Sequence, residues 1–363
     1  MNEVGMTDKM NVLVTGVADI LGRRVAEKLL ELPGYSVIGL DVERPVQEVK
    51  GLDFIQADIR NPLMIELIKT EKINVLCHLG FFESDHPNES AFDYNVMGTM
   101  KLFGACAEAG VQRIIFKSST WVYGAKPNNS SFLNVEQPLH GSRSSGSGRD
   151  LLEIESFCNG FRQQSPETAL TILRFAPIIG PSVDTPLTRF LIDTFAPILL
   201  GFDPRMQVIH EDDVIGAIIH TLRTESRGVY NIAASGVLPL TRLIGMVGKP
   251  PFFVPHFCPY WKARWLGNQK TVTHWPIEPD YLRYHCVANT KKMDTEMQFT
   301  PRYTAEEALR EFAGVRRMNE YSPQPSSLSY DEERLRDTIE RRRRDRQRTS
   351  ENSIRPSKGG SHG

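Results

Sequence analysis

The residues with the clearest chemical potential lie near the start of the chain, where a short apolar run ends in a glycine-containing turn. Residues 11–16 are β-forming and end at Gly16, and a helical spacing of apolar residues begins after Gly22. In this context, backbone N–H groups and the positive end of the helix dipole bind phosphate. The sequence therefore predicts a phosphate-binding turn between the two glycines.

An acidic residue follows at a position suited to a dinucleotide. A second β-type run ends at Asp41, about 25 residues after Gly16. A carboxylate at this point accepts hydrogen bonds from the adenosine ribose and disfavours a 2′-phosphate. We therefore expect NAD rather than NADP, although Arg44 lies close enough to accommodate such a phosphate.

The elements that must position these residues alternate along the chain. Besides residues 11–16, we expect strands over residues 35–41, 53–58, 75–79, 113–118 and 170–175, and helices over residues 23–32, 65–71 and 95–109. Alternating strands and helices predict an α/β fold with a Rossmann-type, doubly wound parallel sheet that binds ligands at the carboxyl ends of its strands.

Composition narrows the class of protein. The chain has 363 residues, a formal net charge of -1 and five widely spaced cysteines with no C-x-x-C pair. This pattern favours reduced thiols over a disulfide framework or a metal site. Residues 1–10 are polar, unlike a signal peptide, and no apolar run approaches the roughly 18 residues of a membrane span. We expect a soluble, cytoplasmic protein.

Several motifs resemble those of extended short-chain dehydrogenase/reductases, specifically the NAD-dependent epimerase/dehydratase family, over about residues 11–313. The matching segments are Thr15-Gly16 with Gly22, Asp58-Ile59, His78-Leu79-Gly80, Asn95 to Thr99, Ser118 to Gly124 and Leu173 to Pro181. The resemblance implies NAD as the cofactor, Ser119 as the active-site hydroxyl, and a nucleotide sugar or similar alcohol as substrate. The cofactor-binding residues that it implies, together with Asp41, are Gly16, Asp19, Ile20, Leu21, Gly22, Asp58, Ile59, Leu79, Gly80, Asn95, Ser118 and Pro177.

The first departure from the family is Asp19, which stands at the middle glycine of the phosphate-binding turn. A side chain there crowds the pyrophosphate, and a carboxylate repels it. Arg23 or Arg24 could offset the charge, so we expect dinucleotide binding to be weakened or altered rather than lost. The alternative is that Asp19 turns to solvent and caps the helix.

The second departure affects the proton-transferring pair. In the family a Tyr-x-x-x-Lys motif opens the helix after the serine-bearing strand, but here Ser147 and Leu151 occupy the two positions. A tyrosine whose pKa is lowered by the lysine acts as general base on an alcohol, whereas serine has no accessible ionisation and leucine supplies no charge. His140 is a substitute base to consider, because histidine titrates near neutral pH. The Gly/Ser-rich residues 141–148 that precede the helix suggest flexibility.

Domain boundaries follow from changes in composition. We expect an N-terminal tail over residues 1–10, a NAD-binding domain over 11–180, a smaller C-terminal α/β lobe with interleaved Rossmann segments over 181–320, and a linker with a charged tail over 321–363. Residues 252–285 are rich in aromatic side chains, and residues 341–348 form a basic run. Lobe packing and a solvated tail are the simpler explanations of these two segments.

Three hypotheses remain open. The leading one is a NAD-binding protein with lost or atypical catalysis, regulatory or metabolite-sensing. The second is an active oxidoreductase, epimerase or dehydratase that uses Ser119 and a substitute base. The third is an interaction protein that uses the aromatic segment and the basic run. A homodimer is a reasonable expectation, and nucleic acid is not expected as a partner.

Overall fold

The computed structural model describes residues 9–143, 145–193, 196–255 and 276–321. The chain divides into two compact units, Met1–Ala313 and Gly314–Gly363. The elements and contacts that matter for function belong to the first unit. The aromatic residues 256–275, including Trp261, Trp265 and Trp275, and the basic run 341–348 lie outside the described residues.

A seven-stranded sheet with the order β11-β6-β5-β4-β1-β2-β3 forms the centre of this unit, and all its pairings are parallel. The order reverses between β1 and β4, which is the point where doubly wound sheets bind ligands. The expected α/β fold is therefore confirmed. The strands are β1 (Met10–Thr15), β2 (Tyr35–Asp41), β3 (Asp53–Gln56), β4 (Val75–His78), β5 (Arg113–Ser119), β6 (Ala169–Phe175) and β11 (Gly228–Ile232).

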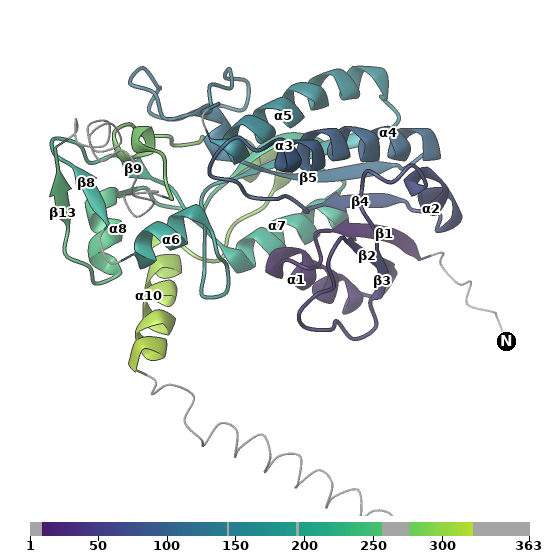
Figure 1. Ribbon diagram of the computed structural model, residues 1–363, viewed down its shortest axis with the longest axis horizontal. Coiled ribbons are helices and arrows are strands. Elements are labelled where there is room, and N and C mark those ends of the chain that lie inside the picture. The colour runs from purple at the N-terminus through teal and green to yellow at the C-terminus, as the bar shows by residue number, and fades with distance from the viewer. Residues whose placement is uncertain (1–8, 144, 194–195, 256–275, 322–363) are drawn as a thin grey trace, which may run out of the picture. The chain divides into compact units, whose positions relative to one another are not determined.

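Helices cover both faces of the sheet (Figure 1). One face carries α1 (Ile20–Leu30) and α7 (Glu211–Thr224). The other carries α2 (Met64–Thr70), α3 (Glu89–Phe92), the π-helical turn η1 (Asp93–Gly98), α4 (Thr99–Ala109) and α5 (Gly146–Gln164). A sheet that is covered on both faces explains why its strands read as apolar runs without clear alternation.

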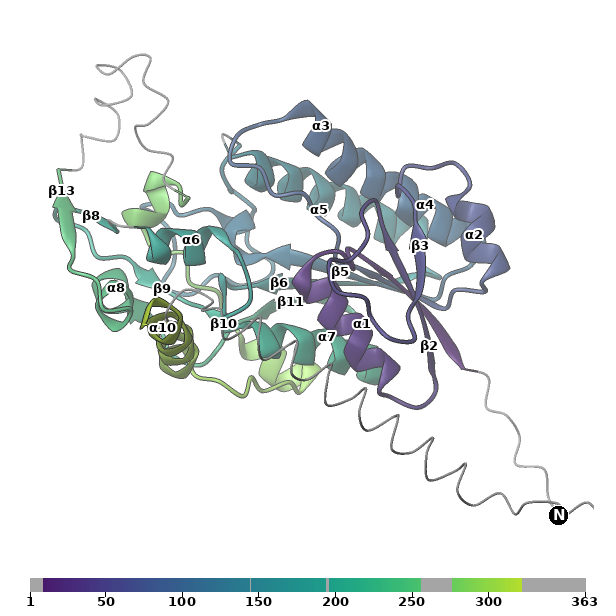
Figure 2. The same ribbon diagram turned by 60° about the horizontal axis from the view of Figure 1, so that its bottom comes forward.

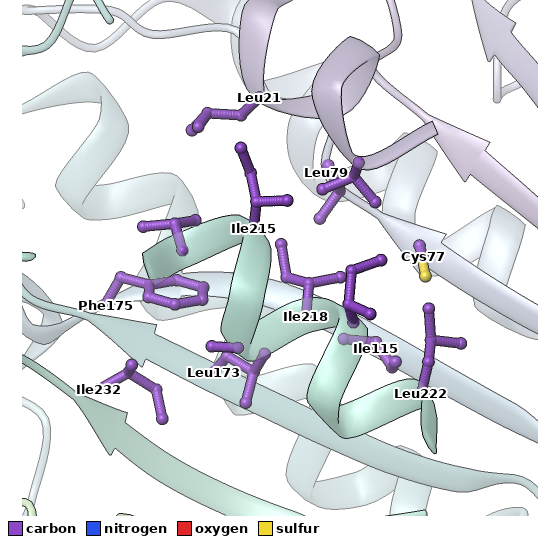
Figure 3. Close-up of a cluster of buried hydrophobic side chains, with 14 of the residues drawn as sticks. Leu21, Cys77, Leu79, Ile115, Leu173, Phe175, Ile215, Ile218, Leu222 and Ile232 are labelled. Atoms are coloured by element: carbon purple, nitrogen blue, oxygen red, sulfur yellow. The ribbon is translucent and has the colours of Figure 1, made fainter. Parts of the chain in front are cut away.

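The core between α7 and the sheet shows how the helical spacing buries apolar side chains. Ile218 of α7 lies on the side of the helix that faces the strands bearing Leu173, Phe175 and Ile115, whereas Ile215 points toward Leu21 of α1 (Figure 3). All of these side chains are buried. Residues at spacings of three and four share one side of a helix, so α7 presents a continuous apolar stripe to the sheet.

Shorter elements form a second cluster beside the sheet (Figure 2). Three small pairs join β7 (Ile178–Ile179) to β10 (Ile209–His210), β8 (Pro197–Leu199) to β13 (Phe252–Val254) and β9 (Arg205–Met206) to β12 (Leu238–Pro239). The remaining elements are η2 (Thr120–Tyr123), α6 (Pro186–Ile192), α8 (Leu240–Met246), η3 (Pro279–Leu282), η4 (Met293–Met297) and α10 (Ala305–Tyr321). None of the helices described is long and apolar enough to cross a membrane.

A buried ion pair fastens α5 to the sheet. Arg174 of β6 and Glu155 of α5 are 5% and 2% exposed, and Arg174 Nη2 lies 2.6 Å from Glu155 Oε2. The same carboxylate accepts a hydrogen bond from Ser118 Oγ at 2.5 Å, and Arg174 Nη1 donates to the Tyr123 hydroxyl at 2.7 Å. The network therefore joins α5, β5, β6 and η2.

We predict that Glu155→Ala lowers the free energy of unfolding by about 3–5 kcal/mol, because it leaves the Arg174 guanidinium buried without its counter-ion. Glu153→Ala is the matched control on the same helix, since Glu153 pairs with the exposed Arg143. It should cost less than about 1 kcal/mol. Urea denaturation measures the free energy of unfolding of both variants. Equal losses in the two would contradict the structural role assigned to the Glu155–Arg174 pair.

Candidate functional site

The glycine turn at the end of β1 is packed backbone against backbone. Gly16 has a φ of 80°, and a Cβ there would lie 2.5 Å from Gly80 Cα. A Cβ on Gly22 would lie 2.0 Å from the Gly16 carbonyl oxygen. Neither contact tolerates a side chain, so both glycines are required by the turn. The turn leads into α1, whose N-terminal backbone supplies N–H groups for an anion.

Asp19 lies exposed at the N-cap position of α1, and its side chain makes no capping hydrogen bond. Both nearby arginines are engaged elsewhere. Arg24 pairs with Glu211 at 3.0 Å and with Asp212 at 2.5 Å, while Arg23 donates to Gln47. Asp19 is thus exposed, as the alternative interpretation expected. Its side chain neither caps the helix nor pairs with Arg23 or Arg24. Its carboxylate stays at the positive end of the helix dipole, where a pyrophosphate would also bind.

Asp41 ends β2 beside this turn and is 8% exposed. Its Oδ2 accepts a hydrogen bond from the Ala18 backbone N–H at 2.8 Å, and its Oδ1 accepts one from Val42 N–H at 2.7 Å. These bonds hold the carboxylate in one orientation at the carboxyl edge of the sheet, as recognition of a ribose requires. Arg44 is turned toward Gln56, with Nε 3.4 Å from the amide oxygen.

Asp58 and Ile59 follow β3, at the far side of the same edge. Asp58 accepts hydrogen bonds from the Arg60 backbone N–H at 2.8 Å and from Arg60 Nη2 at 2.5 Å. These bonds to Arg60 lower the pKa of the Asp58 carboxyl. Ile59 is buried beneath Gly98, where a Cβ would lie 2.8 Å from Ile59 Cδ1.

A buried histidine fixes the end of β4. His78 Nδ1 lies 2.8 Å from Thr15 Oγ1, and His78 Nε2 lies 2.9 Å from Thr99 Oγ1. Burial, assisted by the positive charge of Lys117, lowers the pKa of His78 to about 3, so the ring stays neutral. Thr15 Oγ1 also accepts the backbone N–H groups of Leu79 and Gly80 at 3.2 and 3.3 Å. The two strand ends are thereby held together.

Asn95, within η1, has a visible structural role. Its side chain accepts from Phe82 N–H at 2.8 Å and donates to the Phe82 carbonyl at 2.9 Å. Its Nδ2 also donates to the fully buried Asp150 of α5 at 3.0 Å. Asn95 therefore ties the segment after β4 to the start of α5.

A pocket of about 180 Å³ opens at the carboxyl ends of β5 and β6. It gathers five residues that the sequence singled out from separate parts of the chain: Ser118, Ser119, Ser147, Leu151 and Pro177. His140 is exposed and lies outside the pocket lining.

The hydroxyls of the three serines singled out from the sequence each form a hydrogen bond within the chain. Ser147 Oγ accepts from Ser84 N–H at 2.8 Å and donates to the Ser84 carbonyl at 3.2 Å, and the Ser147 backbone N–H donates to that carbonyl at 2.9 Å. Ser119 Oγ accepts from Trp121 N–H at 3.2 Å. Ser118 Oγ is bonded to Glu155. Leu151 adds an apolar side chain to the pocket lining.

The start of α5 differs from the expected flexible stretch. The helix begins at Gly146, and Ser145 Oγ caps it by accepting from Gly148 N–H at 3.1 Å. A Cβ on Gly146 would lie 2.3 Å from the His86 carbonyl oxygen, and one on Gly148 would lie 2.7 Å from that of Ser142. These glycines thus permit close packing, and residues 146–148 belong to the first turn of a capped helix.

The structure adds pocket residues that sequence reasoning missed. Lys117, Glu83, Glu278, Trp121 and Tyr281 all line the cavity. The Trp121 and Tyr281 ring centroids are 4.7 Å apart, and Tyr281 Oη donates to the Trp121 carbonyl at 2.7 Å. Burial raises the pKa of Tyr281 well above its usual value and also raises that of Glu278. Two of these residues had a sequence signal: Lys117 precedes Ser119 by two positions on one strand and so shares its face, and Trp121 lies within the motif from Ser118 to Gly124.

This fold and site define a Rossmann-type nucleotide-binding protein. The chain belongs to the NAD dependent epimerase/dehydratase family, whose model matches residues 12–233. The family expected from the sequence motifs is therefore confirmed.

Among its relatives, an uncharacterized protein of Mycobacterium tuberculosis is 32% identical over 311 residues, 83% of this chain and 82% of that protein. A UDP-glucose 4-epimerase of Klebsiella pneumoniae is 35% identical over 133 residues, 32% of this chain and 95% of that protein.

Solved structures share the fold. UDP-glucuronic acid 4-epimerase from Bacillus cereus, in complex with UDP-glucuronic acid and NAD, superposes with a TM-score of 0.67 at 21% identity, covering 85% of this chain and 100% of that one. dTDP-glucose 4,6-dehydratase from Bacillus anthracis, in complex with NAD, has a TM-score of 0.66 at 19% identity, covering 86% and 97%. The expectation of NAD agrees with the cofactor bound in both.

We predict that Ser147→Ala lowers the free energy of unfolding by about 0.5–1.5 kcal/mol, because the part-buried Ser84 backbone N–H loses its hydrogen-bond acceptor. Ser130→Ala is the control, since Ser130 is exposed and donates to the Phe132 carbonyl. It should change stability by less than about 0.5 kcal/mol. If Ser147→Ala proves as neutral as the control in thermal and urea unfolding, the proposed structural role of the hydroxyl is wrong.

Proposed function

We propose that this protein binds NAD and that its catalysis is lost or atypical, so that it acts as a regulatory or metabolite-sensing member of its family. One observation carries the proposal. At the two positions of the family's proton-transferring pair, the Ser147 hydroxyl is bonded to the Ser84 backbone and Leu151 forms part of an apolar wall.

The residues present fit NAD. The α1 N-terminus behind Gly16 and Gly22 suits a pyrophosphate, and the oriented Asp41 carboxylate suits the adenosine ribose. The adenine would lie toward Asp58 and Ile59, and the nicotinamide half toward the pocket that contains Pro177. The other residues proposed to contact the cofactor are Asp19, Ile20, Leu21, Leu79, Gly80, Asn95 and Ser118. Bound NAD supplies a hydride acceptor, and the chain must manage the proton of the alcohol.

The pocket lacks the tyrosine and lysine with which the family transfers the proton of the alcohol. A serine hydroxyl that already bonds to backbone groups cannot take the role of an ionisable tyrosine. Loss of a positioned general acid or base costs roughly 10²- to 10⁴-fold in rate. Tyr281 is a poor replacement, because its hydroxyl is bonded to the Trp121 carbonyl and its pKa is raised well above its usual value.

A second candidate is an active oxidoreductase, epimerase or dehydratase acting on a nucleotide sugar or similar alcohol. The observation in its favour is that Ser119 retains its place in the pocket, beside a lysine and carboxylates. His140 would have to move from its exposed position to serve as the base. Of the two, the arrangement of Ser147 and Leu151 favours lost or atypical catalysis.

The proposal includes a cytoplasmic location and a homodimeric assembly. The described cysteines, Cys77, Cys106, Cys158 and Cys286, are free and buried, which suits a reducing compartment such as the cytoplasm. A homodimer remains part of the proposal without a supporting contact.

We predict that titration calorimetry detects NAD binding with preference over NADP, and that Asp41→Asn weakens NAD binding about tenfold, since a charged ribose contact is worth about 1.5–3 kcal/mol. The affinity for NADP should change less, so the ratio of NAD affinity to NADP affinity becomes smaller in this variant. Asp53→Asn, on exposed β3 surface, is the matched control and should leave both affinities unchanged. An unchanged NAD to NADP ratio in Asp41→Asn would contradict the assignment.

For catalysis, we predict that the wild-type protein neither reduces NAD with UDP-glucose nor epimerises it above background. Installing the family pair with Ser147→Tyr and Leu151→Lys should raise turnover by at least about 10²-fold, the factor associated with a general base. Thermal unfolding establishes that the double variant is folded. Wild-type turnover that collapses in Ser119→Ala would instead establish the active-enzyme candidate.

A further inference from the structure

The pocket contains a cation that comes from a different element than the one the family uses. We propose that Lys117 of β5 supplies the positive charge that Leu151 of α5 does not, and that its ammonium binds an oxygen of the nicotinamide half of NAD. This inference rests on the proposed function, because it requires that NAD binds.

Strand order places the nicotinamide half near Lys117. Asp41 ends β2 and Asp58 follows β3, both on one side of β1, and we assign the adenosine half to them. A dinucleotide that crosses the switch point extends to the other side of β1, where β4, β5 and β6 end. Lys117 and Ser119 line the pocket there, together with Pro177.

The charge of Lys117 acts on this part of the site. It contributes to the low pKa of the buried His78, and it lowers the pKa of Glu83, which lines the same pocket, against the larger effect of burial. Glu83 is itself paired with Arg189 of α6 at 2.8 Å. Within the described part of the chain, Lys117 forms no ion pair and is half-buried. Its three donors are therefore available for a ligand oxygen.

The side chains of Lys117 and Leu151 line the same pocket, although they belong to different elements. Both line the pocket, Lys117 from the sheet and Leu151 from α5. The long, flexible lysine side chain can deliver an ammonium to a ligand from either position. A cation moved from Lys117 to position 151 should therefore act on the same ligand, which makes the proposal testable by relocation.

The first experiment compares the affinities of NAD and ADP by calorimetry. Lys117→Met should weaken NAD about tenfold, the lower end for a hydrogen bond to a charged group, and leave ADP unchanged, because ADP contains only the adenosine half. Lys117→Arg should retain most of the NAD affinity. Lys69→Met, which removes a charge from the exposed surface of α2, is the control and should change neither affinity.

The second experiment relocates the charge. Adding Leu151→Lys to Lys117→Met should recover at least part of the lost NAD affinity, whereas Leu151→Lys alone should add little, because two ammonium groups would then face one cavity. Equal weakening of NAD and ADP in Lys117→Met, or no weakening of NAD, overturns the assignment while NAD binding by the wild type stands. A wild-type protein that binds ADP and NAD no better than a denatured control overturns the proposed function and this inference together.

Discussion

The buried ion pair between Glu155 and Arg174 is the constraint on which the site depends. Its carboxylate also accepts the Ser118 hydroxyl, and its guanidinium bonds to the Tyr123 hydroxyl and the Val135 carbonyl. Because breaking such a buried pair is costly, α5 must stay fixed on β5 and β6. The ion pair therefore fastens α5 to the sheet at a point beyond its first two turns.

Hydrogen bonds also hold the start of α5. At the start of α5, Ser147 bonds to Ser84, Asp150 to Asn95, and Arg149 donates to the Asn88 carbonyl. Three side chains within one helical turn thus tie the helix to the segment after β4. We propose that these structural hydrogen bonds stand where other members of the family would handle a proton.

The proposed NAD-binding region matches the family at the two glycines and at Asp41, and it differs from the family at Asp19. The glycine turn and Asp41 have the geometry that a dinucleotide requires. Asp19 instead places a carboxylate beside the pyrophosphate position, and the nearby Arg23 and Arg24 are bonded to other partners. The two effects oppose each other, which is consistent with binding that is weaker than usual but selective for NAD.

Sequence reasoning predicted the central sheet well, because strands buried on both faces appear as short apolar runs such as the one ending at Gly16. It also predicted that Ser119 and Ser147 would share a site, since the family motifs carry that information. It missed Lys117, although the two-residue spacing from Ser119 on β5 carried a signal for it. It missed Glu278, because which glutamate faces a cavity depends on packing between distant segments. Gly146 and Gly148 suggested flexibility for the same reason, as their contacts with His86 and Ser142 are tertiary.

A crystal structure of the protein grown with NAD tests the central claim most directly. The account predicts a dinucleotide across the strand ends, with Asp41 at the adenosine ribose, Lys117 bonded to the nicotinamide half and the Ser147 hydroxyl still bonded to Ser84. A structure in which Ser147 has left Ser84 and points at the nicotinamide, or in which NAD lies away from Asp41, would contradict it.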